Sequence, residues 1–536
     1  MKYYYIYTLI ATIFSLPTIA QETYENTKLV SNDLNGTARY IGMGGAMEAL
    51  GTELSTINTN PAGIGLSRHN YFSITGGVIN TKGAKTFFNE KTTIPSFDQI
   101  GFIISTRKRN NSILNFAFNY SKNKSFNYIL NAANALNGSS QNKQSYGKAL
   151  LGTESNGGFT IDKTKDGEYM GYENTKSSNV AWTFNQLDYL YWNAVIPNAK
   201  DGKFYNYEAN SFVLNRENSG YIGSYDFNVS GSISNRIFWG STFSYKNVNY
   251  TGYSEYNELL SKNLGTITVL DHRMITGGGI DISFGIIACP IEKSPFRIGL
   301  YFKTPTWFDL RTSNDTYIKN GTKQGGLHDT GQVSNNYDFK VWTPWRFGIS
   351  LGHTIGKRIA LGATYEYEDY SAINTRINKE TVVDYYYGST YETTDADKAM
   401  NRHTAQTLRG VSKIKIGFEI RPINMLYIRG GYNYISSLFN KNAQKNQHIS
   451  SPGATYTSAT DFTNWDALHR LTFGVGVKVN NFNIDLAYQT SKENGLFFPF
   501  STDNISVNGL SLHNNPKPTK IERVKKQFSL TIGYTF

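Results

Sequence analysis

The chain has 536 residues, with 53 Lys and Arg against 41 Asp and Glu, a formal net charge of +12. Aromatic residues make up 14% of it and there are 49 Gly, whereas there are only 13 Pro and one Cys. The lone Cys289 excludes an internal disulfide, and the polar average hydropathy does not suggest a helical membrane protein. Abundant Tyr, Phe and Gly favour one large β-structure with many turns.

The first twenty residues predict a secretory signal peptide, residues 1–20. Lys2 precedes an apolar stretch that runs from Tyr3 to Leu16, and the small Ala20 is followed by the polar Gln21. A basic start, an apolar run and a small residue before the cut are typical of such signals. We expect Gln21 to be the first residue of the mature chain, and the run is too short to span a bilayer comfortably.

Residues 21–70 predict a compact segment, because they lack the alternation of a strand. Clustered glycines permit tight turns and close approach in a confined space, and Pro61 biases the residue before it towards an extended conformation. A wide barrel is not filled by its own side chains. We therefore expect this compact segment to lie inside the barrel that the residues after it predict. Its motif residues are Gly42, Gly44, Gly45, Asn60, Pro61, Ala62 and Gly63.

Residues 71–536 predict an all-β transmembrane antiparallel barrel of about fourteen strands, an even number as in single-chain bacterial barrels. Apolar residues alternate with polar or small ones in each predicted strand. The predicted strands lie near 71–79, 98–107, 113–122, 221–233, 236–250, 274–288, 295–304, 345–355, 358–370, 411–420, 425–436, 469–480, 482–491 and 526–536. Links after the even-numbered strands are tight and links after the odd-numbered ones are long, which is typical of short periplasmic turns and long extracellular loops.

The longest link, from about Asn123 to Gly220, contains an apolar cluster. Its members are Trp182, Phe184, Leu187, Tyr189, Leu190 and Trp192. An exposed apolar cluster on a loop marks a binding surface or a packed lid. Two interpretations stay open, an outer groove for a hydrophobic substrate and a loop that folds onto its neighbours at the barrel mouth.

Four basic residues on the predicted strands are candidates for lining the lumen, namely Lys413, Lys415, Arg429 and Lys478. A charge in a wall of low dielectric interacts strongly, so these residues could attract a carboxylate head group. The alternative is a lumen wall whose cations are solvated or ion-paired.

The last predicted strand ends at Phe536 and alternates strictly, with Phe528, Leu530, Ile532 and Tyr534 on one face. An amphipathic final strand with a terminal aromatic residue is typical of barrels that the bacterial assembly machinery inserts into the outer membrane. We expect this strand to pair with the one near Tyr71 and close the sheet. The predicted location is the outer membrane of a Gram-negative-type bacterium, in contact with outer-membrane lipid.

The segments Gly42-Met43-Gly44-Gly45-Ala46 and Asn60-Pro61-Ala62-Gly63 resemble the N-terminal hatch of the FadL/TodX family. Members of this family transport long-chain fatty acids and other hydrophobic compounds across the outer membrane. The resemblance implies a fourteen-stranded barrel with a hatch inside it and passive uptake of a hydrophobic or amphipathic molecule. It also implies a sideways exit through a kinked strand, for which Gly76-Gly77 and Gly277-Gly278-Gly279 are candidate positions.

Two other functions remain open at this stage. One is a hemin-binding receptor, in which His or Tyr would ligate the iron; the other is a structural or adhesive barrel. The sequence shows no nucleophile elbow, phosphate loop, zinc helix or calcium loop, so we expect no enzyme, no cofactor and no metal. A positive charge on a secreted barrel favours anionic lipids or lumen solutes over nucleic acid.

Overall fold

The structure is a computed structural model of the whole chain. It describes residues 21–82, 92–107, 112–151, 160–163, 169–172, 182–198, 201–326, 328–384, 389–446, 449, 451–507 and 510–536. The predicted signal peptide, residues 1–20, lies outside the described residues.

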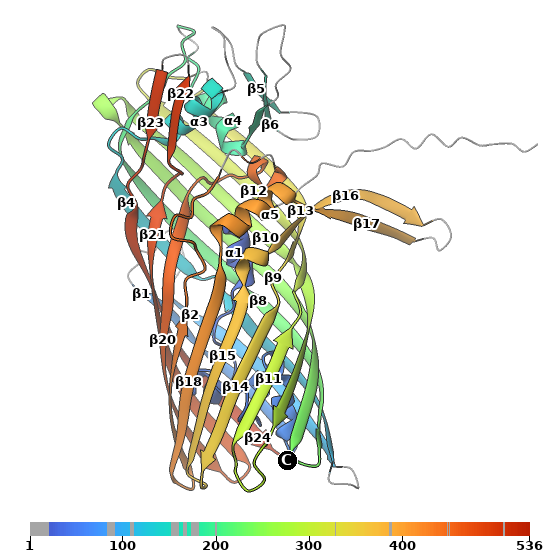
Figure 1. Cartoon of the computed structure of the whole chain (residues 1–536). Coiled ribbons are helices and arrows are strands. Elements are labelled where there is room, and N and C mark those ends of the chain that lie inside the picture. The colour runs from blue at the N-terminus through green and yellow to red at the C-terminus, as the bar shows by residue number, and fades with distance from the viewer. Residues whose placement is uncertain are drawn as a thin grey trace, which may run out of the picture.

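Fourteen strands close into one antiparallel barrel (Figure 1). Some positions around it hold two strands in series. In order the positions are β1 (Tyr71–Lys82), β2 (Thr93–Arg107), β3 (Ile113–Ser125) with β4 (Tyr128–Ala135), β8 (Ala209–Ile233), β9 (Ile237–Leu260), β10 (Gly265–Ala288), β11 (Arg297–Lys303) with β12 (Trp307–Thr322), β14 (Arg346–Ile355) with β13 (Thr330–Trp342), β15 (Ile359–Asp369) with β16 (Asn374–Asp384), β18 (Gly410–Ile423) with β17 (Ser389–Ala396), β19 (Leu426–Ile435), β20 (Phe462–Val479), β21 (Phe482–Phe498) and β24 (Thr519–Thr535). The fold class predicted from the sequence is confirmed.

The barrel closes where β24 pairs with β1. The ladder runs from Tyr71 opposite Thr535 to Lys82 opposite Val524. The predicted closure is therefore confirmed. At the end of the barrel where the chain ends, residues 234–236 join β8 to β9, one residue more than the predicted turn of Ser234 and Asn235, and both of these residues have positive φ.

Alternation along each strand separates a lipid-facing surface from the lumen. On β20, Leu471, Phe473 and Val475 are each about half exposed on the outer face, while Thr472 between them is buried. Without lipid the outer face has nothing to cover it, so this band is the surface that contacts the membrane. Several strands extend beyond their predicted ends. For example, β8 begins at residue 209, whereas the predicted strand begins at 221. The alternation of apolar and polar residues that lipid imposes stops where the strand leaves the membrane, so the sequence did not predict these extensions.

Short helices fill and cap the barrel, and among the described residues none is long and apolar enough to cross a membrane. Those of the N-terminal segment are α1 (Thr23–Val30), α2 (Ala38–Gly42), η1 (Leu54–Asn58) and η2 (Pro61–Leu66). The others are α3 (Gln141–Leu151), α4 (Gln186–Ala194), η3 (Ser261–Asn263), η4 (Tyr370–Ala372), α5 (Lys398–Thr407) and α6 (Pro452–Thr455).

The N-terminal segment lies inside the barrel, shown in blue in Figure 1. Its helices are largely buried against the inner wall. At the opposite end from the tight turns, α3 and α4 form a lid with the small strands β5 (Thr160–Lys163), β6 (Tyr169–Tyr172), β7 (Trp182–Phe184), β22 (Asp503–Val507) and β23 (Leu510–Asn514). The lumen is thus bordered by the hatch at one end and by the lid at the other.

The membrane band gives a first prediction. Leu486 points outward on β21, paired with Val475 and Leu530, which also face lipid. We expect Leu486→Lys to lower the free energy of unfolding in lipid vesicles by about 2–4 kcal/mol, because a charge then faces acyl chains. Urea titration followed by tryptophan fluorescence measures this.

Asn336→Lys is the matched control. Asn336 is exposed on β13, where the outward residues are polar. A change within about 0.5 kcal/mol is expected there. Equal losses in both variants would contradict the assignment of the band to the membrane.

Candidate functional site in the barrel lumen

The hatch packs its backbone directly against glycines of the inner wall. A Cβ atom on Gly285 would overlap the side chain of Asn60, and one on Gly240 would overlap the carbonyl of Pro61. Eight neighbouring strands, β9 to β11, β14, β15 and β18 to β20, each supply one such glycine: Gly240, Gly285, Gly299, Gly352, Gly362, Gly417, Gly431 and Gly474. We call this set the glycine track. Only a residue without a side chain lets two backbones approach so closely.

The hatch motif forms the turns that fit this track. Gly44 and Gly45 have φ of 62° and 72°, which disfavours any side chain there. Asn60 caps η2, because its side-chain oxygen accepts the N–H of Ala62 at 3.2 Å, and Pro61 occupies the first turn. The motif therefore shapes the hatch itself.

Ion pairs fix the hatch to the wall. Arg39 lies 3.0 Å from Glu419, and Glu48 lies 2.9 Å from Lys415. Glu48 also accepts the hydroxyl of Thr364 at 2.7 Å. Buried charges need such partners, because an unpaired one is costly in a medium of low dielectric.

Of the four cations predicted for the lumen, three are buried and ion-paired. Lys413 lies 2.7 Å from Glu368, and Lys415 lies 2.7 Å from Glu366. Arg429 bridges Glu419 and Asp485 at 2.6 Å each. Lys478 is exposed near the turn between β20 and β21. The ion-paired lumen wall is thus the interpretation that the geometry supports for the first three.

The apolar cluster predicted as an outer groove lies in the core of the lid. Phe184, Leu187, Leu190 and Trp192 are all buried, and Tyr189 packs against the same core. Trp182 belongs to β7, but its side chain lies outside the described residues. The cluster packs on Phe212 and Phe497 of the strands below, because one side of α4 faces the barrel mouth. The structure therefore places these residues in a packed lid, with no exposed groove at the four buried ones.

Beside α1 of the hatch lies a cavity of about 240 Å³, which we call the lumen cavity, and wall strands including β3, β8, β20, β21 and β24 also line it. Much of its wall is aromatic. These residues are Tyr24, Phe126, Tyr128, Tyr250, Tyr370, Phe439, Phe462 and Trp465. Such a wall suits an apolar chain or ring.

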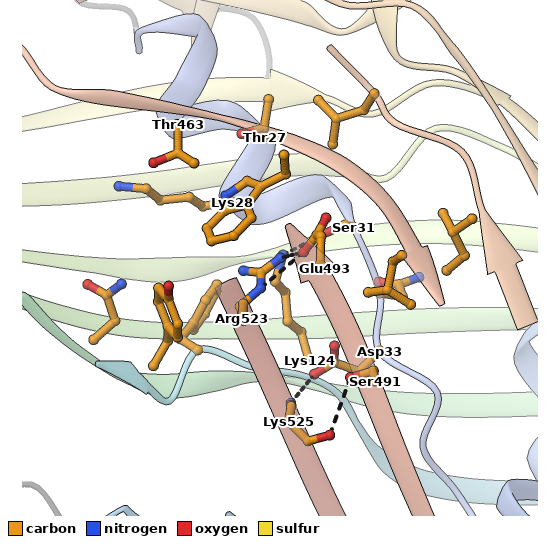
Figure 2. Close-up of a pocket in the computed structure, with 18 of the residues that line it drawn as sticks. Thr27, Lys28, Ser31, Asp33, Lys124, Thr463, Ser491, Glu493, Arg523 and Lys525 are labelled. Atoms are coloured by element: carbon orange, nitrogen blue, oxygen red, sulfur yellow. Dashed lines mark hydrogen bonds and ion pairs between the residues drawn. The ribbon is translucent and has the colours of Figure 1, made fainter. Parts of the chain in front are cut away.

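One corner of the lumen cavity carries four cations and two carboxylates, which we call the basic corner. Arg523 pairs with Glu493, and Lys525 lies 2.7 Å from Asp33 (Figure 2). Lys124 and Arg470 complete the set that lines the cavity: Lys124, Arg470, Arg523, Lys525, Asp33 and Glu493. The corner therefore has a surplus of positive charge.

Two of these cations have no carboxylate partner among the residues that the structure describes. Arg470 is 6% exposed, and its Nε has no hydrogen-bond acceptor. Lys124 donates to the hydroxyl of Ser31 and lies 5.7 Å from the ring of Phe126. A buried guanidinium without a partner favours binding of an anion, which would supply the missing acceptors.

The segment Ser31–Asn35, which we call the strap, links α1 to the rest of the hatch and crosses this region. The Asp33 N–H donates to the carbonyl of Asn123 at 2.8 Å, and its carboxylate accepts the Ser125 N–H at 3.0 Å. Burial raises the pKa of the Asp33 carboxyl, but Lys525 and the Ser125 N–H outweigh it and hold that pKa well below its usual range. Asp33 is therefore ionised at neutral pH.

The strap lies where the ladder between β2 and β3 ends. The last pair is Gln99 opposite Ser121, and beyond it β3 is paired only with β8 among the described strands. Asn35 bonds both sides, donating to Asp98 of β2 at 3.2 Å and to the carbonyl of Lys122 on β3 at 2.9 Å. The strap thus takes the place of a missing strand neighbour.

A strand irregularity lies here, at a position that the sequence did not reveal. The register between β3 and β8 shifts at Asn123, which is a β-bulge, and the strand is interrupted before Tyr128. Of the two glycine candidates, Gly76 does sit at a register shift between β1 and β2. The prediction for Gly277–Gly279 is wrong, because the ladders of β10 with β9 and β12 run through it without a shift.

Three solved structures are similar to this chain at low identity. The Ralstonia pickettii toluene transporter TbuX is 13% identical, with 94% of this chain and 99% of that chain covered and a TM-score of 0.46. The Pseudomonas putida toluene transporter TodX is 11% identical, with 94% and 99% covered and a TM-score of 0.44. A Pseudomonas aeruginosa FadL homologue is 10% identical, with 95% and 100% covered and a TM-score of 0.47.

No protein-family model and no curated protein matches the chain. The roles of individual residues in this chain therefore rest on its own geometry.

The glycine track gives a second prediction. A methyl group on Gly285 has no room beside Asn60, so we expect Gly285→Ala to displace the hatch and lower the midpoint of thermal unfolding. Circular dichroism of the purified barrel follows the transition.

Gly76→Ala is the matched control, since a Cβ there meets nothing closer than the carbonyl of Ser96 at 3.6 Å. Gly76 also lies on a strand of the barrel wall, and we expect Gly76→Ala to leave the midpoint of thermal unfolding nearly unchanged. A Gly285→Ala protein as stable as the Gly76→Ala protein would contradict the close packing of hatch and wall.

Proposed function

We propose that the protein is an outer-membrane channel for passive uptake of amphipathic small molecules with an acidic head group, such as long-chain fatty acids. The observation that carries this proposal is the lumen cavity, in which an aromatic wall adjoins a corner with unpaired cations. The apolar part of the ligand packs on Phe126, Phe462 and Trp465. Its head group binds Arg470 and Lys124.

The lumen cavity has an aromatic wall and a separate corner of cations, which supports an amphipathic ligand over a plain hydrocarbon. A hydrocarbon in this cavity would leave Arg470 without an acceptor, at the cost of a buried unpaired charge. A carboxylate supplies two acceptor oxygens in the planar geometry that a guanidinium matches.

The route past the hatch runs beside the strap. The body of the hatch is held by the glycine track and by two ion pairs to the wall, from Arg39 and from Glu48, so its displacement is costly. The strap is held by hydrogen bonds to the irregular edge of β3 and by the partly exposed ion pair between Asp33 and Lys525, with no glycine of the track behind it. We infer that the ligand passes where the β2–β3 ladder ends, while the body of the hatch stays in place.

A binding experiment tests the proposed function. Purified protein in detergent is titrated with hexadecanoate and with hexadecanol, and the tryptophan fluorescence is recorded. We expect saturable binding of both ligands, and Arg470→Gln should weaken hexadecanoate binding by about tenfold while hexadecanol binding changes little, since the lost interaction is charge-assisted.

Lys492→Gln is the control, because Lys492 pairs with Glu522 on the exposed surface of the barrel. It should bind both ligands as the unaltered protein does. If the unaltered protein binds neither ligand saturably, the proposed function is overturned. An equal loss of both ligands in Arg470→Gln would overturn the assigned role of that residue.

A further inference from the structure

We propose that Asp33 is a latch, a carboxylate of the chain itself that occupies the basic corner until the head group of the ligand displaces it. This inference rests on the proposed function and deepens it, because it says how binding releases the strap. The ligand class is an amphiphile with a carboxylate head group.

The contacts of Asp33 join the strap to both the cation cluster and the wall. A single oxygen, Oδ2, accepts from Lys525 Nζ at 2.7 Å and from the Ser125 N–H at 3.0 Å. The backbone N–H of the same residue donates to Asn123 at 2.8 Å. Loss of Asp33 from Lys525 therefore also loosens the strap from the bulged edge of β3.

The ion pair of Asp33 is partly exposed, as is the pair between Arg39 and Glu419, whereas the pair between Glu48 and Lys415 is buried. The side chains of Asp33 and Lys525 are 30% and 19% exposed, whereas Glu48 is 0% exposed beside Lys415 at 11%. Asp33 and Lys525 both line the lumen cavity. A carboxylate that enters the cavity can therefore reach Lys525 and compete with Asp33 for it.

The charge balance of the basic corner favours this exchange. Four cations face only Asp33 and Glu493, so the corner can accept another negative charge without an excess of carboxylates. Arg523 and Glu493 hydrogen-bond to each other through two guanidinium nitrogens, Nε and one Nη. The cations left to share between Asp33 and a ligand are Lys124, Arg470 and Lys525.

Release of the strap would join separate spaces in the lumen. Asn32, next to Asp33, lines the lumen cavity and also two smaller cavities of about 80 and 20 Å³. The strap is thus the partition between them. Its movement would also uncover the edge of β3 beyond Ser121, which otherwise bonds Asp33 and Asn35.

The test compares Asp33→Asn with Asp461→Asn. An Asn at position 33 keeps the shape and the acceptor for the Ser125 N–H but loses the charge. Asp461 pairs with Arg216 at 2.7 Å in the same cavity and has no hydrogen bond or ion pair with the strap among the described contacts. Both variants remove one negative charge from the cavity, but only the first removes the latch.

Strap exposure is read by the rate at which a maleimide labels Asn32→Cys in a Cys289→Ser background. We expect hexadecanoate to raise this rate several-fold and hexadecanol to leave it unchanged. Asp33→Asn should label fast without any ligand and bind hexadecanoate about tenfold more tightly, because the competing carboxylate is gone. Asp461→Asn should label slowly until hexadecanoate is added.

The outcomes separate the two proposals. If the unaltered protein binds neither amphiphile, both the proposed function and the latch are overturned. If it binds hexadecanoate while labelling stays at the unliganded rate, or if Asp33→Asn labels as slowly as Asp461→Asn, the latch alone is overturned.

Discussion

The close packing of the hatch backbone on the glycine track is the constraint on which the rest of this molecule depends. Side chains at Gly240, Gly285 or Gly362 would occupy the space that the hatch fills. Because the wall is bare there, a short segment can bridge a wide lumen without bulky residues of its own. The hatch needs Gly44 and Gly45 at its turns for the same reason. The glycines of the wall and the glycine turns of the hatch therefore make the two surfaces complementary in shape.

The lumen has a polar lining in a space largely withdrawn from bulk water, so its charges must be matched. Several of them are: Glu48, Glu366, Glu368 and Glu419 each pair with a cation. The surplus at the basic corner stands out against this matched background. A place where the matching fails is where a ligand gains most by binding, because it restores the balance.

The sequence predicted the parts of the fold that lipid enforces. Strict alternation in strands such as β20 and β24 follows from one face meeting acyl chains, and a period of two can be recognised without any structure. The hatch motif was recognisable because Gly44 and Pro61 impose local backbone geometry. The bulge at Asn123 was not, since it depends on pairing with β8 and on contacts with the strap, which are distant in sequence.

The candidate site was harder to predict for a similar reason. Lys413 and Lys415 were chosen from their alternation, but alternation does not show that Glu368 and Glu366 lie across the ladder from them. Arg470 lies within a predicted strand, on the inner side between outward neighbours, so the signal for it was present. Lys124 lies beyond the predicted end of its strand, where the regular pattern stops. The loop cluster around Leu190 was apolar because it is a core, which composition alone could not distinguish from a groove.

The closing ladder between β1 and β24 has a consequence for how the chain is made. The hatch precedes β1 in the chain and touches strands from β9 to β20, so it lies within a ring that closes where β1 pairs with β24. The chain must therefore enclose its own N-terminal segment, either as the sheet curves around it or by entry of the segment through the open end of the ring. In both cases the glycines of the wall meet their partners only when strands far apart in the sequence have come together.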